Sequence, residues 1–260
     1  MKITDIHAHY DDARYEGKER EFLAELFSKD VETVIGAAVS TDNSRTQISL
    51  AEKFDRFYAS VGIHPENAKN VEDIQKNIKE LRTLLDHPKV VAIGEIGLDY
   101  YWEDYPDRET QKAYFRAQIE LALKNGLPIV VHDREAHGDC LEIVREYKGV
   151  RGVFHSFSGS AEMARELVEL GLYISFSGVV TFKNARKTVE AAEIVPIDRI
   201  LTETDAPYLT PHPFRGQRNS SQYVSYIVEK LAEIKGVSPD EMAEIVAKNA
   251  ERLFKIPRKY

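Results

Sequence analysis

Eight short apolar runs alternate with longer amphipathic runs along this chain, and this alternation constrains the possible fold more than any other feature of the sequence. Most of the apolar runs have the length of a strand and are continuously hydrophobic, as strands buried on both faces are. They cover residues 3–6, 33–38, 58–61, 90–93, 129–131, 152–154, 173–176 and 199–202. Such runs are typical of parallel strands that are covered by helices.

The segments between these runs have a helical pattern. The clearest apolar stripe consists of Val71, Ile74, Ile78, Leu81 and Leu85. We expect further helices over residues 22–28, 45–54, 110–124, 139–147, 161–170, 185–192, 221–234 and 239–254. The last of these is predicted to begin with Ser238 as its N-cap and Pro239 as its first residue, with a capping-box glutamate at Glu241.

This order of elements predicts an α/β fold, a (β/α)8 barrel of the TIM type that occupies residues 1–260 as a single domain. No linker, low-complexity segment or change of composition indicates a second domain. A doubly wound open sheet is the competing fold. That fold carries a glycine-rich phosphate loop after its first strand, whereas this chain has His7 and His9 there.

The amino-acid composition limits the compartment and the kinds of binding partner that we expect for this protein. No apolar stretch approaches the ~20 residues of a membrane span, and the first residues lead directly into a strand without a signal-peptide pattern. The single cysteine, Cys140, excludes an internal disulfide and fits a reducing compartment, so we expect a cytoplasmic protein. The formal net charge is −8. A polyanionic substrate therefore has to be held by local positive charge.

Metal-ligating side chains recur where the strands end. In a barrel of this type the carboxyl ends of the strands form one mouth, which holds the active site. The candidate ligands are His7, His9, Glu95, His132, His155 and Asp205. Four imidazoles and two carboxylates are too many for one tetrahedral ion, but they suit two ions ~3.5–4 Å apart that share a carboxylate.

Glu95 is the expected bridge, because its strand lies between the first strand and the strands that carry His132 and His155. One ion is predicted to bind His7, His9, Glu95 and Asp205, and the other Glu95, His132 and His155. A water shared by the two ions would lose a proton near neutral pH and act as the nucleophile, with Asp205 accepting that proton. Mixed nitrogen and oxygen ligands admit Mg, Mn, Zn or Co.

Three further residues lie near the strand ends, and two of them, Glu203 and His64, have two possible roles each. Glu203 either acts on the leaving oxygen or the water, or orients a metal-bound histidine. His64 either donates a hydrogen bond to a phosphate oxygen or braces a ligand. Asp99 is expected to cap a helix N-terminus.

Two loops are candidates for substrate contact. The loop of residues 211–219 offers Arg215 and Arg218, which either grip phosphate or tie the loop down locally. The loop that begins with Tyr100 is aromatic, and its rings either stack on unpaired bases or pack as a lid. Its aromatic members are Tyr100, Tyr101, Trp102 and Tyr105.

Taken together, the motifs resemble those of TatD-type metal-dependent deoxyribonucleases, within the amidohydrolase-like barrels, over nearly the whole chain. The resemblance lies in Asp5-Ile6-His7-Ala8-His9, Gly62-Ile63-His64-Pro65, Gly94-Glu95-Ile96-Gly97-Leu98-Asp99-Tyr100, Val131-His132-Asp133-Arg134-Glu135-Ala136, His155-Ser156-Phe157-Ser158-Gly159 and Glu203-Thr204-Asp205-Ala206-Pro207-Tyr208-Leu209. It implies the same six metal ligands. It also implies cleavage of DNA phosphodiesters, often from the 3′ end of single strands, with magnesium or a transition metal.

The expected function is therefore a two-metal deoxyribonuclease that digests single-stranded or frayed DNA, 3′ to 5′. The closest alternative is a hydrolase of a carboxylic ester or amide on the same scaffold, such as an aminoacyl-tRNA deacylase, because the same ions polarise a carbonyl. A metal-dependent nucleic-acid-binding protein is the non-enzymatic alternative. The complete ligand set counts against it, since binding alone does not need an activated water.

Overall fold

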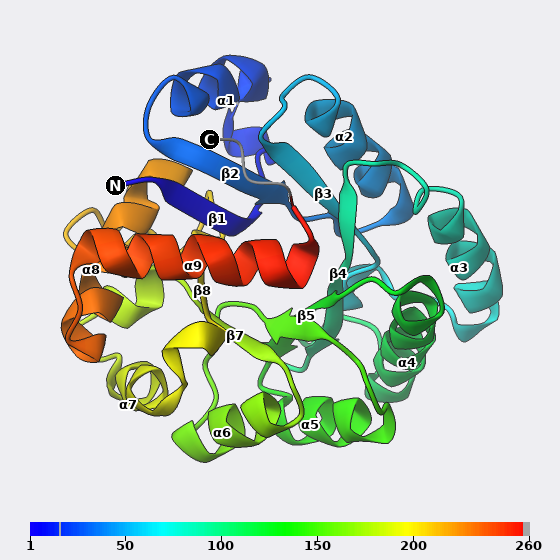
Figure 1. Cartoon of the computed structure of the whole chain (residues 1–260). Helices are drawn as coiled ribbons and strands as arrows, with labels where there is room; N and C mark the ends of the chain where they lie inside the picture. Colours follow the sequence, from blue (N-terminus) through cyan, green and yellow to red (C-terminus); the bar gives the residue numbers. More distant parts are fainter. Residues whose placement is uncertain (16, 257–260) are drawn as a thin grey trace.

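Eight parallel strands lie side by side in sequence order in the computed structural model, which describes residues 1–15 and 17–256 (Figure 1). The strands are β1 (Ile3–Ala8), β2 (Val31–Gly36), β3 (Phe57–Val61), β4 (Val90–Asp99), β5 (Ile129–Arg134), β6 (Gly152–Phe154), β7 (Tyr173–Phe176) and β8 (Ile200–Thr202). The helices are α1 (Glu19–Phe27), α2 (Thr41–Ala51), α3 (Ile74–Arg82), α4 (Arg108–Asn125), α5 (His137–Glu146), α6 (Ala161–Glu169), α7 (Arg186–Ile194), α8 (Val224–Lys235) and α9 (Pro239–Phe254).

The sheet closes where β1 meets the segment that follows β8. Ala8 and Ala206 form a parallel bridge, the amide of His9 donates to the carbonyl of Ala206 at 2.7 Å, and the amide of Asp205 donates to the carbonyl of His7 at 3.0 Å. The predicted single-domain (β/α)8 barrel is thus confirmed. The predicted range of 1–260 includes residue 16 and residues 257–260, which lie outside the described part of the chain.

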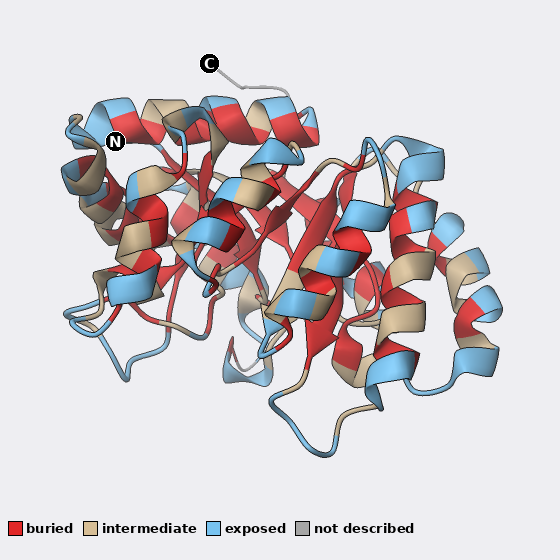
Figure 2. Cartoon of the chain, turned by 90° about the horizontal axis from the view of Figure 1, so that it is seen from below, coloured by how far each residue is buried: buried red, intermediate tan, exposed pale blue. Residues whose placement is uncertain are grey.

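Burial follows the two-layer architecture. The strands are largely buried, and the helices bury the side that faces the strands while they expose the opposite side (Figure 2). Helix α9 crosses one end of the barrel (Figure 1). Its residues Leu253 and Phe254 share one core cluster with the inward side chains of the strands, among them Ile6, Ile35 and Leu201. Helix α9 therefore closes the end opposite the strand-end ligands. Within the described ranges, no helix is long and apolar enough to span a bilayer.

Strands β4 and β5 continue past their predicted ends. Their ladder runs on through Gly97 with His132 and Asp99 with Arg134, so Glu95 and His132 lie within strands instead of after them. Gly97 adopts a φ of 140°, and a Cβ there would collide with the carbonyl group of His132. The close approach of β4 to β5 therefore requires glycine at this position.

Two helix predictions need correction. Val71 was expected on the buried stripe of one helix, but it lies in a separate 3-10 turn before α3 and is 52 % exposed. The helix expected from residue 221 begins at Val224, after a 3-10 turn over Ser221–Tyr223. The predicted N-cap and first residue of α9 are confirmed: the side chain of Ser238 accepts from the amide of Glu241 at 3.2 Å, and Pro239 begins the helix.

Candidate metal centre

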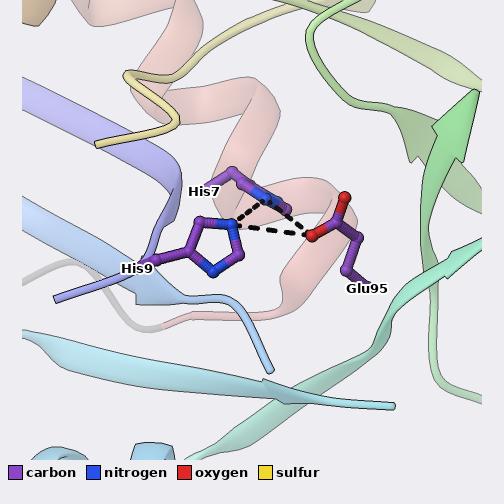
Figure 3. Close-up of side chains that lie close together, drawn as sticks. All are labelled: His7, His9 and Glu95. Atoms are coloured by element: carbon purple, nitrogen blue, oxygen red, sulfur yellow. Dashed lines mark hydrogen bonds and ion pairs between the residues drawn. The ribbon is translucent and has the colours of Figure 1, made fainter. Parts of the chain in front are cut away.

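The six predicted ligands come together around the carboxylate of Glu95. In Figure 3, the rings of His7 and His9 from the β1 segment point toward Glu95 from β4. The Nε2 atoms of the two histidines lie 3.3 Å apart. They lie 3.3 Å and 3.6 Å, respectively, from Oε2 of Glu95. One oxygen of this carboxylate thus faces the histidine pair of the first strand.

The other oxygen of Glu95 faces a second set of imidazoles. Its Oε1 lies 2.7 Å from Nδ1 of His132 and 2.9 Å from Nε2 of His155, and these two nitrogens are 3.2 Å apart. Glu95 itself is only 3 % exposed. A single buried carboxylate therefore joins two separate groups of nitrogen donors.

Asp205 completes the first group. Its Oδ1 lies 3.4 Å from Nε2 of His9 and 3.6 Å from Nε2 of His7. The backbone of Asp205 adopts the left-handed region with a φ of 56°, which is uncommon for a residue other than glycine. This turn brings the carboxylate back over the barrel mouth.

Hydrogen bonds orient two of the imidazoles from outside the cluster. Nε2 of His132 lies 3.0 Å from Oδ2 of Asp99, and Nδ1 of His155 lies 3.1 Å from Oε1 of the buried Glu203. Carboxylates in such positions fix the tautomer and direction of metal-bound histidines. Of the two roles left open for Glu203, this contact favours the orienting one. The expectation that Asp99 caps a helix was wrong, because Asp107 caps α4 instead.

Charges within the cluster hold its carboxylates ionised. Burial alone would raise the pKa of Glu95, but the surrounding imidazoles, led by His155, hold it well below its usual value. Burial also opposes charge on His9, yet its hydrogen bond to Asp205 and the nearby carboxylate charges together outweigh burial and raise its pKa to about 9. The site therefore has the electrostatics of a cation site, and a divalent ion bound there would take the place of the imidazole protons.

The donor set fits divalent metal ions. Among the described residues, three groups place their ligand atoms within 4.8 Å of one another: His7, His9 and Glu95; His7, His155 and Asp205; and His64, Glu95 and His132. A tetrahedral ion with ligands at about 2.1 Å separates its donors by about 3.4 Å, close to the spacing of the histidine pair and Asp205. Imidazole and carboxylate donors suit Mg, Mn, Zn or Co.

A cavity of about 680 Å³ opens onto this cluster. His64 lines the cavity, with Nε2 3.6 Å from Oε1 of Glu95, and burial lowers its pKa to about 3, which keeps the ring neutral. A neutral imidazole there can donate or accept a hydrogen bond. The cavity is also lined by Trp102, Tyr105 and Arg134.

The other predicted substrate contacts lie outside the cavity lining. The guanidinium of Arg215 is 3.9 Å from the ring centroid of Phe182. Arg218 packs over Phe22 at 4.3 Å and donates to the carbonyl of Arg14 at 2.7 Å. The hydroxyl of Tyr100 donates to Asp139 at 2.7 Å. For the two arginines, these contacts favour the second of the two predicted roles, in which they tie the loop down locally.

Sequence reasoning missed Asp99 as a partner of His132, and it gave Arg134 no role of its own. Both residues can be placed from the sequence once the predicted strands are extended by a few residues. Side chains two or four positions apart in a strand share a face, so Asp99 follows Glu95 and Arg134 follows His132. The signal was present in the spacing, but the predicted strand ends stopped short of it.

A barrel of eight parallel strands with a histidine and carboxylate cluster at its mouth defines a class, the metal-dependent hydrolases of the (β/α)8 type. A family model described as TatD related DNase matches residues 4–255. The chain therefore belongs to the TatD family of metal-dependent hydrolases.

Individual relatives agree with this assignment. YabD, an uncharacterized metal-dependent hydrolase of Bacillus subtilis, is 41 % identical over 256 residues, which cover 98 % of this chain and 99 % of that protein. TatD of Mycobacterium tuberculosis, also an uncharacterized metal-dependent hydrolase, is 37 % identical over 97 % of both chains. The crystal structure of YJJV, a TatD homolog from Escherichia coli, is similar with a TM-score of 0.87 and 30 % identity, and covers 98 % of both chains.

Proposed function

We propose that this protein is a two-metal deoxyribonuclease that hydrolyses phosphodiester bonds of single-stranded or frayed DNA from the 3′ end. One observation carries the two-metal part. The two oxygens of the buried Glu95 carboxylate face different histidine pairs, with Oε2 toward the first strand and Oε1 toward His132 and His155. A carboxylate shared in this way is the usual bridge between two ions ~3.5–4 Å apart.

The chain's own residues would divide the work as follows. His7, His9 and Asp205 would hold one ion, His132 and His155 would hold the other, and Glu95 would serve as a ligand of both. Such ions, when bound, make a water nucleophilic at neutral pH and stabilise charge on the phosphoryl oxygens. Asp205 lines the cavity, and contacts with His9 and His7 hold its pKa below the usual value against the effect of burial. Its ionised carboxylate would accept the proton of the attacking water.

Glu203 would act indirectly. It is fully buried, and its carboxylate contacts Nδ1 of His155. A carboxylate in that position keeps the opposite nitrogen, Nε2, free to bind metal. We therefore assign Glu203 the task of orienting His155 toward the site.

Specificity for DNA rests on the family, whose model is described as TatD related DNase. His64 lines the cavity and would hydrogen-bond a phosphate oxygen there. Arg215, Arg218 and Tyr100 would contact only DNA that extends beyond the cavity. Cys140 is buried and free, in keeping with a cytoplasmic site of action.

A substrate panel tests the proposal. Purified protein is stripped of metal, reloaded with Mg²⁺, Mn²⁺ or Zn²⁺, and incubated with end-labelled single-stranded DNA, RNA and an aminoacyl ester. We expect metal-dependent shortening of the DNA labelled at its 5′ end, as a ladder that descends from the 3′ end. Loss of the ester with intact DNA would replace the proposal with the ester hydrolase. Retention of DNA without cleavage would replace it with a binding function.

A further inference from the structure

The cavity that leads to the metal ligands is strongly acidic. Besides Glu95 and Asp205, its lining includes the carboxylates of Asp11, Asp12, Glu66, Asp99 and Asp133. Arg134 is the only lysine or arginine among the described lining residues. A phosphodiester that enters this cavity therefore meets a single guanidinium or ammonium group among these lining residues.

Arg134 is held in place by aromatic rings. It is the last residue of β5, two positions after His132. Its guanidinium carbon lies 4.0 Å from the ring centroid of Tyr101 and 5.4 Å from that of Trp102. Stacking on aromatic faces keeps a guanidinium charged and oriented while its N–H groups stay free to bind phosphate.

The same loop presents an open aromatic surface. Trp102 lines the cavity and is 45 % exposed, an unusual position for so large an apolar side chain. The loop that carries it is anchored on both sides. The amide of Tyr101 donates to Asp99 at 3.0 Å, and the hydroxyl of Tyr105 donates to Glu66 at 2.9 Å. Trp102 is thus held at the rim by a fixed loop.

We propose that Trp102 and Arg134 form a nucleotide subsite, in which an unpaired base stacks on the indole ring and its phosphate binds the guanidinium. The proposal rests on the proposed nuclease function and adds the residues that select the substrate. Bases in a duplex are stacked on their neighbours and cannot lie on Trp102. The subsite therefore gives the preference for single-stranded or frayed ends a structural cause.

Trp102 is the single tryptophan of the chain, so its fluorescence reports the subsite alone. Metal-loaded protein is titrated with a phosphorothioate oligothymidylate, which resists hydrolysis, while fluorescence anisotropy of a label on the oligonucleotide measures binding separately. We expect quenching of Trp102 that saturates with binding. An abasic oligonucleotide with the same number of phosphates should bind more weakly and leave the fluorescence unchanged.

Variants test the two halves of the subsite. Trp102→Ala and Arg134→Gln should each weaken binding of the oligonucleotide about 10-fold, and Trp102→Phe should restore most of the loss. Arg108→Gln is the matched control, because Arg108 also stacks on an aromatic ring, Tyr100 at 4.3 Å, but does not line the cavity. Its binding should equal that of the unaltered protein.

The outcomes separate this inference from the function on which it rests. If DNA is cleaved but Trp102 is not quenched, the subsite is overturned and the nuclease proposal stays intact. The same holds if DNA is cleaved but Arg134→Gln binds the oligonucleotide as tightly as Arg108→Gln does. Quenching without cleavage under any metal overturns the nuclease proposal and leaves a nucleotide-binding surface. Absence of binding by anisotropy overturns the subsite, and it overturns the nuclease proposal as well only where DNA is also left uncleaved under every metal.

Discussion

The direction in which His132 presents its ring depends on one carboxylate that is not itself a predicted ligand. Asp99 is 2 % exposed and lies 3.0 Å from Nε2 of His132, so that Nδ1 is turned toward Glu95. The pair resembles the carboxylate and histidine pairs that support metal ligands in general. At the residue scale, the orientation of the His132 ring is therefore set by a residue outside the candidate ligand set.

Replacing Asp99 by Ala should weaken metal binding about 10–100-fold, because His132 loses the partner that fixes its ring. Asp99→Asn should cost less, since the amide oxygen still accepts a hydrogen bond. The measurement is a calorimetric titration of metal-stripped protein with Mn²⁺ or Zn²⁺. Asp104→Asn is the control, because it changes an exposed carboxylate in the loop that follows β4. Equal affinities for the Ala variant and this control would show that His132 needs no support.

The convergence of the six candidate ligands could be predicted from sequence, whereas their supporting partners could not. His7, His9, Glu95, His132, His155 and Asp205 all lie near the carboxyl ends of strands, and the barrel brings those ends together whatever the loop lengths are. The contact of Asp99 with His132 depends instead on how far β4 and β5 stay paired. The length of that pairing depends on tertiary contacts, so it cannot be predicted from the apolar run over residues 90–93.

At the scale of elements, a polar joint connects the aromatic loop to two helices. Asp139 of α5 accepts a hydrogen bond from Tyr100 at 2.7 Å and pairs with Lys112 of α4 at 2.8 Å. The contact with Lys112 is the main cause of the lowered pKa of Asp139, and Tyr100 adds to it. The joint ties the base of the loop that carries Trp102 to the helical layer.

This joint predicts a stability that depends on pH. The pKa of Asp139 is lower in the folded chain than its usual 3.8, so folding is favoured by the ionised form. Its contribution is present above that usual value and is lost as the pH falls through the folded pKa. Asp139→Asn should therefore lower the free energy of unfolding by about 1 kcal/mol near neutral pH, and by less in acid.

Urea unfolding of the unaltered protein and of Asp139→Asn, near neutral pH and in acid, measures the loss of unfolding free energy under each condition. An equal effect of Asp139→Asn at both pH values would show that the carboxylate's charge does not contribute. Glu109→Gln serves as a comparison, because Glu109 also contacts Lys112, at 3.2 Å, but is 82 % exposed at its side chain. We expect it to change stability little at either pH.

Element boundaries were the least predictable part of the fold. Apolar residues recur with a helical period over the whole of 221–234, yet the first three residues form a 3-10 turn. The reason is that the Ser221 side chain hydrogen-bonds to the buried side chains of Tyr10 and Asp5. These partners lie more than 200 residues away in the sequence. A local pattern carries no record of such contacts, although it places the body of α8 correctly.

At the scale of the whole molecule, one helix closes the barrel at the end away from the candidate metal centre. Phe254 of α9 is 3 % exposed and packs with the inward residues of the strands. The alternation of elements predicted the barrel and α9 itself. It could not predict this closure, because an amphipathic helix after the eighth strand can equally cover the outer side.

Phe254→Ala should lower the free energy of unfolding by about 3 kcal/mol, since it leaves a cavity in the barrel floor. Metal affinity should be unchanged, because the floor and the mouth lie at opposite ends of the strands. Denaturant unfolding and a metal titration of the same variant measure the two quantities. Leu170→Ala, at a position that is 37 % exposed, is the control for loss of an apolar side chain. A loss of metal affinity in the folded Phe254→Ala variant would show that the two ends are coupled.

The central claim is that one buried carboxylate bridges two ions, and anomalous diffraction from crystals grown with saturating Mn²⁺ tests it most directly. The account predicts two peaks about 3.5–4 Å apart, one beside Oε2 of Glu95 with His7 and His9, the other beside Oε1 with His132 and His155. In crystals of Glu95→Ala at least one of the peaks should vanish. A single peak at saturation in the unaltered protein would contradict the claim.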